Sequence, residues 1–256
     1  MSAETETGDR EAAIGHDVAT GPSSPEEAEA RGEAPGLREH RYVPPQGATQ
    51  LLLVRHGEST PVDADESFAM RDGQGDPDLG EDGRSQAHTI SQRLAGEPLD
   101  AIYVSSLRRT QQTAAPLLRR IGKQPIVEPD LREAHLGEWE GHVWRIRIAE
   151  RHPMAVQMID EQRWDVISGS EPIDEFADRV VRVLNAIARR HAGRAVAVFT
   201  HAGVIGAAMA HACNSSPYPF NAADNASISQ VVIFDGRWRI KRFNDTAHLM
   251  PLVAVS

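Results

Sequence analysis

The stretch QLLLVRHGES, residues 50–59, decides the fold and points to the chemistry of this chain. Its first half is a short apolar run of the kind found in a strand that is buried on both faces. Two further runs, residues 101–104 and 195–199, have the same character, and each precedes a segment with helical signals. Strands that alternate with helices predict a largely parallel sheet.

Two later patterns complete the predicted fold. Apolar residues recur at spacings of three and four between residues 173 and 188, which predicts one buried face of a long helix. Residues 227–234 and 238–243 flank Asp235-Gly236, a pair that favours a hairpin turn. We therefore expect an α/β fold, a three-layer sandwich with a mostly parallel central sheet, one antiparallel edge strand and helices on both faces.

The first part of the chain has a different composition from the rest. Residues 1–46 are rich in Glu, Ala, Gly, Pro and Ser and nearly lack aromatic and β-branched residues, so they cannot bury enough surface to offset chain entropy. Residues 1–48 contain ten acidic and four basic residues, and so carry −6 of the net charge of −10. We expect a disordered acidic tail over residues 1–46 and one domain over residues 48–256.

Composition also excludes several classes of function. The arginines are scattered and form no basic stripe, which argues against nucleic-acid binding. No apolar run of about eighteen residues occurs, and the N-terminus lacks the basic end and apolar stretch of a signal peptide, so we expect no membrane partner. The single cysteine, Cys213, allows no internal disulfide and is expected to be buried. The cytoplasm is the simplest location.

Polar residues with phosphate chemistry follow the predicted strands. The carboxyl ends of parallel strands form the ligand crevice of an open sheet. Arg55 supplies a guanidinium for phosphate oxygens, His56 an imidazole that can attack phosphorus, and Gly57 a backbone that can approach a bound group closely. Arg109 and His201 follow the second and third strands, so four side chains are expected to surround a phosphoryl group.

These residues lie in four blocks that resemble the histidine phosphatase superfamily, also called the phosphoglycerate mutase-like family. Arg55-His56-Gly57 matches the family signature, and the pattern Ser-x-Leu-x-Arg-x-x-Gln-Thr-Ala of residues 105–114 selects Arg109 rather than Arg108. His201 matches the second histidine, and residues 131–141 resemble the stretch that carries the proton donor, placed at Glu133. The blocks occur in the family's order and cover roughly residues 50–245.

The resemblance implies a phosphatase-type member, a phosphomonoester hydrolase that forms a phosphohistidine on His56 and needs no metal or cofactor. It also implies that Glu133 protonates the leaving oxygen and then activates water. The implied catalytic residues are His56, Glu133, Arg55, Arg109 and His201, and the implied substrate-binding residues are Arg55, Gly57, Ser59, Arg109, His201 and Ala202.

Alternatives remain open at this stage. Arg109 could be a surface arginine, His201 a core or capping histidine, and Glu138 or Glu140 the donor in place of Glu133. A phosphoglycerate mutase and a catalytically silent phosphate-binding module would share the fold. Ala202, where the family usually has glycine, leaves no acidic donor after the second histidine.

The substrate is expected to be a small phosphorylated molecule, and its identity is left open. Whether the chain forms a homodimer is also left open. Residues 140–172 are expected to belong to the cap that selects it. The cap candidates are Arg145, Arg147, Arg151, Arg163 and Trp164.

Overall fold

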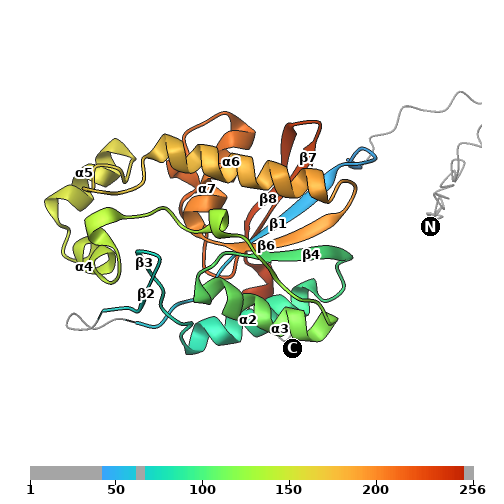
Figure 1. The fold of residues 1–256 in the computed structure, drawn as a ribbon, viewed down its shortest axis with the longest axis horizontal. Coiled ribbons are helices and arrows are strands. Elements are labelled where there is room, and N and C mark those ends of the chain that lie inside the picture. The colour runs from blue at the N-terminus through green and yellow to red at the C-terminus, as the bar shows by residue number, and fades with distance from the viewer. Residues whose placement is uncertain (1–41, 62–66, 251–256) are drawn as a thin grey trace, which may run out of the picture. The chain divides into compact units, whose positions relative to one another are not determined.

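The computed structural model describes residues 42–61 and 67–250. Most of the predicted tail, residues 1–41, lies outside them, so its disorder stays a prediction. Within the described part of the chain, six strands form one sheet in the order β5-β4-β6-β1-β7-β8 (Figure 1). The strands are β1 (Thr49–Arg55), β4 (Leu99–Val104), β5 (Ile126–Val127), β6 (Ala195–Thr200), β7 (Ile228–Phe234) and β8 (Arg237–Asp245).

The three predicted central strands are confirmed as β4, β6 and β1. They pair in parallel, with Leu53 beside Val198 in β6 and Tyr103 beside the same residue from the other side. All three therefore end at the same edge of the sheet. The short strand β5 extends the parallel part beyond β4 and was not predicted. Its two residues are too few to show a period.

The predicted antiparallel edge is confirmed as the hairpin of β7 and β8. Strand β7 runs antiparallel to β1, and β8 runs antiparallel to β7 at the outer edge. Asp235 and Gly236 both have positive φ angles, of 49° and 69°. Both turn residues of a tight primed turn need this conformation, which explains why an Asp-Gly pair occurs here.

Helices cover both faces of the sheet (Figure 1). Alternate residues of β1 divide between them: Leu51 and Leu53 pack in the cluster of α6 and α7, and Leu52 and Val54 in the cluster of α2 and α3. This alternation follows from the period of two in a strand, and it confirms the predicted three layers. The covering helices are α2 (Glu81–Leu94), α3 (Arg108–Ile121), α6 (Ile173–Arg190) and α7 (Ala202–Cys213).

Further segments lie beyond the carboxyl ends of the central strands (Figure 1). They are the helices α4 (Val143–Ala149) and α5 (Pro153–Glu161) and the two-stranded sheet of β2 (Met70–Arg71) and β3 (Gln74–Gly75). They form a cap over the edge where the strands end. Among the described helices, none is long and apolar enough to span a membrane.

The expectation that Cys213 is buried is wrong, because its side chain is exposed. Cys213 is the last residue of α7, whose buried residues end at Ala210. The apolar run continues in the sequence beyond the point where the helix leaves the core.

Candidate active site

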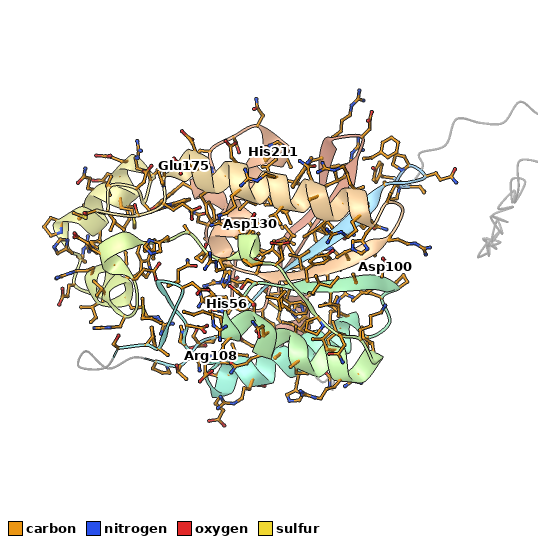
Figure 2. The ribbon with its side chains drawn as sticks, in the orientation of Figure 1. His56, Asp100, Arg108, Asp130, Glu175 and His211 are labelled. Carbon is orange, nitrogen blue, oxygen red and sulfur yellow. The ribbon has the colours of Figure 1, made fainter. Side chains whose placement is uncertain are left out.

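His56 follows β1 directly. It lies at the opposite end of the sheet from Asp100, which is near the start of β4 (Figure 2). Its side chain is buried, and Nδ1 lies 2.7 Å from the carbonyl oxygen of Gly57. Because a carbonyl only accepts, Nδ1 carries the proton of the neutral ring. The lone pair is therefore on Nε2, which has no hydrogen-bond partner among the described residues.

Two guanidinium groups lie close to this imidazole. Arg55 is the last residue of β1 and donates from Nη1 to the carbonyl oxygen of Ala223 at 2.5 Å. Its Nε is buried and has no partner within the described residues. Arg109, in the first turn of α3, is buried and donates from Nη1 to the carbonyl oxygen of Gly75 at 2.9 Å. The sequence analysis expected both arginines beside His56 at this edge of the sheet, and the structure has them there.

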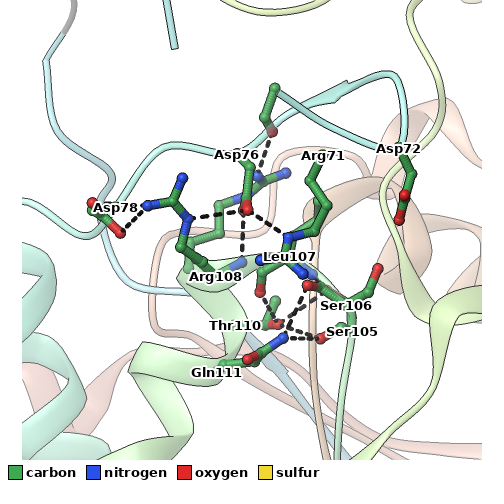
Figure 3. Close-up of polar contacts among 12 residues, drawn as sticks. Arg71, Asp72, Asp76, Asp78, Ser105, Ser106, Leu107, Arg108, Thr110 and Gln111 are labelled. Carbon is green, nitrogen blue, oxygen red and sulfur yellow. Dashed lines mark hydrogen bonds and ion pairs between the residues drawn. The ribbon is translucent and has the colours of Figure 1, made fainter. Parts of the chain in front are cut away.

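A buried carboxylate, Asp76, holds the start of α3 in place (Figure 3). Its Oδ1 accepts from the backbone N–H of Arg108 at 2.6 Å, and its Oδ2 from Nε of Arg71 and of Arg108. This carboxylate replaces the missing cap, since the side chain of Leu107 cannot cap the helix. Arg109 follows the anchored residue, so its direction is set by contacts outside its own helix.

His201 lies behind His56 rather than in the open part of the site. Its side chain is 0% exposed, and the centroids of the two imidazole rings are 5.2 Å apart. Nε2 lies 2.9 Å from Oγ of Ser105, whereas Nδ1 is buried without a partner within the described residues. A buried polar nitrogen with no partner is unfavourable, so a bound group that reached Nδ1 would satisfy it.

Burial and the neighbouring positive charges both favour the neutral form of the two histidines. Burial, followed by the positive charges of Arg109 and Arg55, holds the pKa of His56 well below its usual value. The pKa of His201 is lowered by burial and by the same charges. Burial also lowers the pKa of Arg109 to about 10, which leaves it protonated at neutral pH. The site therefore combines an uncharged imidazole with cationic neighbours, as attack on an anionic phosphate requires.

A pH prediction follows from the lowered pKa of His56. The neutral ring is the form present above its pKa, so it should persist as the pH falls below 6.5, the usual value for histidine. We expect NMR of ¹⁵N-labelled imidazoles in the unliganded protein to give a titration midpoint for His56 well below 6.5. A midpoint of His56 at or above 6.5 would contradict the described environment.

Glu133 reaches the site from the loop that follows a 3₁₀ turn at Pro129–Leu131. Its carboxylate accepts from the backbone N–H of Gly203 and of Ala134, both at 3.1 Å. A Cβ atom at position 203 would overlap Oε1 of Glu133, so glycine is needed there for space.

The two other carboxylates considered as donors are placed differently. Glu138 is exposed and does not line the cavity. Glu140 lines it, but both of its oxygens accept from backbone N–H groups, those of Gly75 and Leu136. This placement favours Glu133 over both alternatives.

The remaining predicted residues divide into two groups. Ser59 and Ala202 line the cavity together with Arg55, His56, Arg109 and Glu133, whereas Gly57 and His201 are not part of its lining. A Cβ atom on Gly57 would lie 2.6 Å from the carbonyl oxygen of Gly83. The structure thus gives this glycine a packing role against α2 in addition to any close approach to a bound group.

The cavity has a volume of about 350 Å³, and its lining includes more residues than the sequence analysis selected. Arg145 and Trp164 were named as cap candidates, and the structure places both in the lining. Trp139 and Trp144 also line the cavity and pack edge to face, with ring centroids 6.1 Å apart. The lining residues that sequence reasoning missed include Phe68, Gln74, Gly75, Pro77 and Asn221.

No sequence signal distinguished those residues, because they belong to short strands and loops without a period. Among the residues that the structure describes, no group of three or more His, Cys, Asp or Glu side chains is arranged to hold a metal ion.

Comparisons with known proteins identify the family of the chain. Residues 51–246 match the family model of the histidine phosphatase superfamily (branch 1). The chain is 35% identical over 205 residues to a protein of Arabidopsis thaliana named metal-independent phosphoserine phosphatase, covering 78% of this chain and 83% of that one. It is 30% identical over 210 residues to a probable phosphoglycerate mutase of Yersinia enterocolitica, covering 79% and 96%.

Among solved structures, the fold is similar to that of a mycobacterial glucosyl-3-phosphoglycerate phosphatase. The TM-score is 0.64 at 26% sequence identity, and the match covers 78% of this chain and all of the other.

Proposed function

Because the chain belongs to the histidine phosphatase superfamily (branch 1) and is of its phosphatase type, we propose that it hydrolyses small phosphomonoesters through a phosphohistidine on His56. One observation carries this proposal. The proton of the neutral His56 ring is held on Nδ1 by the carbonyl of Gly57, so the lone pair of Nε2 is free in a cavity that Arg55 and Arg109 also line. A nucleophile with its lone pair exposed and cations beside it is the arrangement that phosphoryl transfer needs.

The proposed first step transfers the phosphoryl group to the enzyme. Nε2 of His56 forms a bond to phosphorus while the bond between phosphorus and the leaving oxygen breaks. Arg55 and Arg109 bind the phosphoryl oxygens, Nδ1 of His201 donates to one of them, and Glu133 gives a proton to the leaving alcohol.

The second step releases phosphate. Glu133, now a carboxylate, takes a proton from water as the water oxygen bonds to phosphorus and the bond to Nε2 breaks. The electron pair of that bond returns to His56, and Glu133 is again protonated for the next cycle.

The positive charge for both steps comes from guanidinium groups that are already in place. Fixed charges stabilise a phosphoryl transition state without reorganisation, so we propose that the reaction needs no metal. The name of the Arabidopsis thaliana relative, metal-independent phosphoserine phosphatase, supports this view.

The size of the cavity supports a small substrate. Its volume of about 350 Å³ is at the lower end of the range for small-molecule pockets, roughly 300–1,000 Å³. A phosphorylated metabolite fits such a space better than a folded phosphoprotein.

A phosphoglycerate mutase of the same fold is the second candidate, favoured by the match to the Yersinia enterocolitica relative. The two functions differ in whether the phosphoryl group passes to water or to a second hydroxyl group. Incubation with 3-phosphoglycerate, followed by separate assays for free phosphate and for the 2-isomer, distinguishes them.

Chelator and vanadate test the proposed mechanism together. We expect activity to survive prolonged treatment with EDTA and to be inhibited by vanadate, which imitates the phosphoryl group in its transition state. Phosphate release from p-nitrophenyl phosphate measures both. Activity that disappears with chelator and returns with a divalent cation would count against a site built from side-chain charges alone. A catalytically silent phosphate-binding module would release no phosphate in any of these assays.

A further inference from the structure

Arg179, in the first half of α6, donates from every N–H group of its guanidinium. Nε and Nη2 donate to the two carboxylate oxygens of Glu171, at 2.9 and 2.8 Å. Nη1 donates to the carbonyl oxygens of Asp130 and Arg132, at 2.6 and 3.1 Å, and Nη2 donates also to that of Glu133 at 3.4 Å. A guanidinium has five N–H donors, so the acceptors of the protein itself use all of them. Arg179 therefore has no donor left for a substrate.

The three carbonyl groups belong to the segment that carries Glu133, the proposed proton donor. This segment is the 3₁₀ turn at Pro129–Leu131 followed by residues 132–135, which belong to no helix or strand. Gln74 of β3 adds one more bond, from Nε2 to the carbonyl oxygen of Glu133 at 2.8 Å. Because the segment has no hydrogen-bond ladder of its own, contacts from α6 and β3 fix its backbone.

The ion pair of Arg179 and Glu171 is itself held in one geometry. The two side chains are only 15% and 19% exposed, and the pair is bidentate, which restricts both of its partners. Oε2 of Glu171 also accepts from the backbone N–H of His135 at 3.2 Å. On its other side, the guanidinium lies over the buried ring of Phe176, with Cζ 4.8 Å from the ring centre.

We propose that Arg179 is a positioning residue that directs the carboxyl group of Glu133 toward the leaving oxygen. The carboxylate of Glu133 accepts from the backbone N–H groups of Gly203 and Ala134, so its direction depends on where the segment holds it against α7. A displacement of about 1 Å in a reacting group costs about 10²-fold in rate. This inference rests on the proposed function and adds to it a residue outside the four sequence blocks.

Arg179→Lys tests the proposal, because lysine keeps the positive charge but has three donors on a flexible chain. We expect the phosphorylation step to slow about ten- to hundredfold with glycerol phosphate. With p-nitrophenyl phosphate, whose leaving group needs no proton, it should slow less than about threefold. Single-turnover formation of labelled phosphohistidine measures both rates. Arg182→Lys, at an exposed position on the same helix, is the matched control and should change neither.

A double-mutant cycle shows whether Arg179 acts through Glu133. In a Glu133→Gln protein the group that Arg179 positions is already lost, so adding Arg179→Lys should slow phosphorylation by glycerol phosphate no further. Glu171→Gln weakens the ion pair from its other end and should have the same selectivity for the alkyl ester as Arg179→Lys. It replaces Arg179→Lys in the cycle if melting curves show that the lysine variant does not fold.

Three results would overturn the positioning role. They are an equal loss with both esters, an unchanged rate with glycerol phosphate in a folded variant, and a loss that adds fully to that of Glu133→Gln. An equal loss would give the ion pair a purely structural role. Wild-type enzyme that forms no phosphohistidine from p-nitrophenyl phosphate would instead argue against the proposed chemistry at His56, so the two failures are distinguishable.

Discussion

Replacing His56 with alanine is expected to reduce turnover to background and to abolish the phosphoenzyme with every substrate. The substitution removes Nε2, the atom that bonds to phosphorus, so neither an activated nor an unactivated ester can react by this route. We expect a loss on the order of 10⁶-fold in kcat, as for other covalent nucleophiles. The measurement is a rapid quench with ³²P-labelled substrate under alkaline conditions, in which phosphohistidine survives, followed by steady-state release of phosphate.

His88→Ala is the matched control, because His88 is an exposed histidine on α2. It should keep full activity and the labelled intermediate. Melting curves of both variants show whether they fold, since His56 is buried and the new alanine leaves space. A folded His56→Ala protein that still accumulates label would mean that another side chain is the nucleophile.

The central sheet could be predicted because its strands are long enough to carry a signal. The runs that became β1, β4 and β6 are continuous and apolar, and the Asp-Gly turn between β7 and β8 has a conformation that few other pairs adopt. The strands β2, β3 and β5 have two residues each, so no period exists in them. They form through pairing with neighbours, which the local sequence does not contain.

The residues of the candidate site also include some that the sequence could predict and some that it could not. Arg55, His56 and His201 directly follow or end strands, so the parallel topology alone brings them to one edge. Asp76 lies in a stretch rich in Gly and Asp, a composition typical of a solvated loop. Its side chain is nevertheless buried and accepts a hydrogen bond from the first turn of α3. Its role depends on contacts with Arg71 and Arg108 across the fold. For the same reason, the sequence alone could not select Arg145 among the cap arginines.

Glu133→Gln is expected to separate protonation of the leaving group from attack by His56. Glutamine keeps the shape of the side chain, and its amide oxygen can still accept from Gly203, but it cannot give a proton to the leaving oxygen. An alkyl phosphate needs that proton, so its phosphorylation step should slow by about 10²–10⁴-fold. The nitrophenolate ion leaves without help, so phosphohistidine should form readily from p-nitrophenyl phosphate. Dephosphorylation should also be slow, because the same carboxylate is the base for water.

Single-turnover measurements with p-nitrophenyl phosphate and with glycerol phosphate distinguish these steps. Glu138→Gln is the matched control, since this neighbouring carboxylate is exposed and should leave both rates unchanged. For Glu133→Gln, the expected result is that the phosphoenzyme accumulates with the aryl ester and hardly forms with the alkyl ester. If the phosphorylation step slows equally for both esters, Glu133 supports the site without donating the proton. Glu140, whose carboxylate also lines the cavity, is then the residue to replace next.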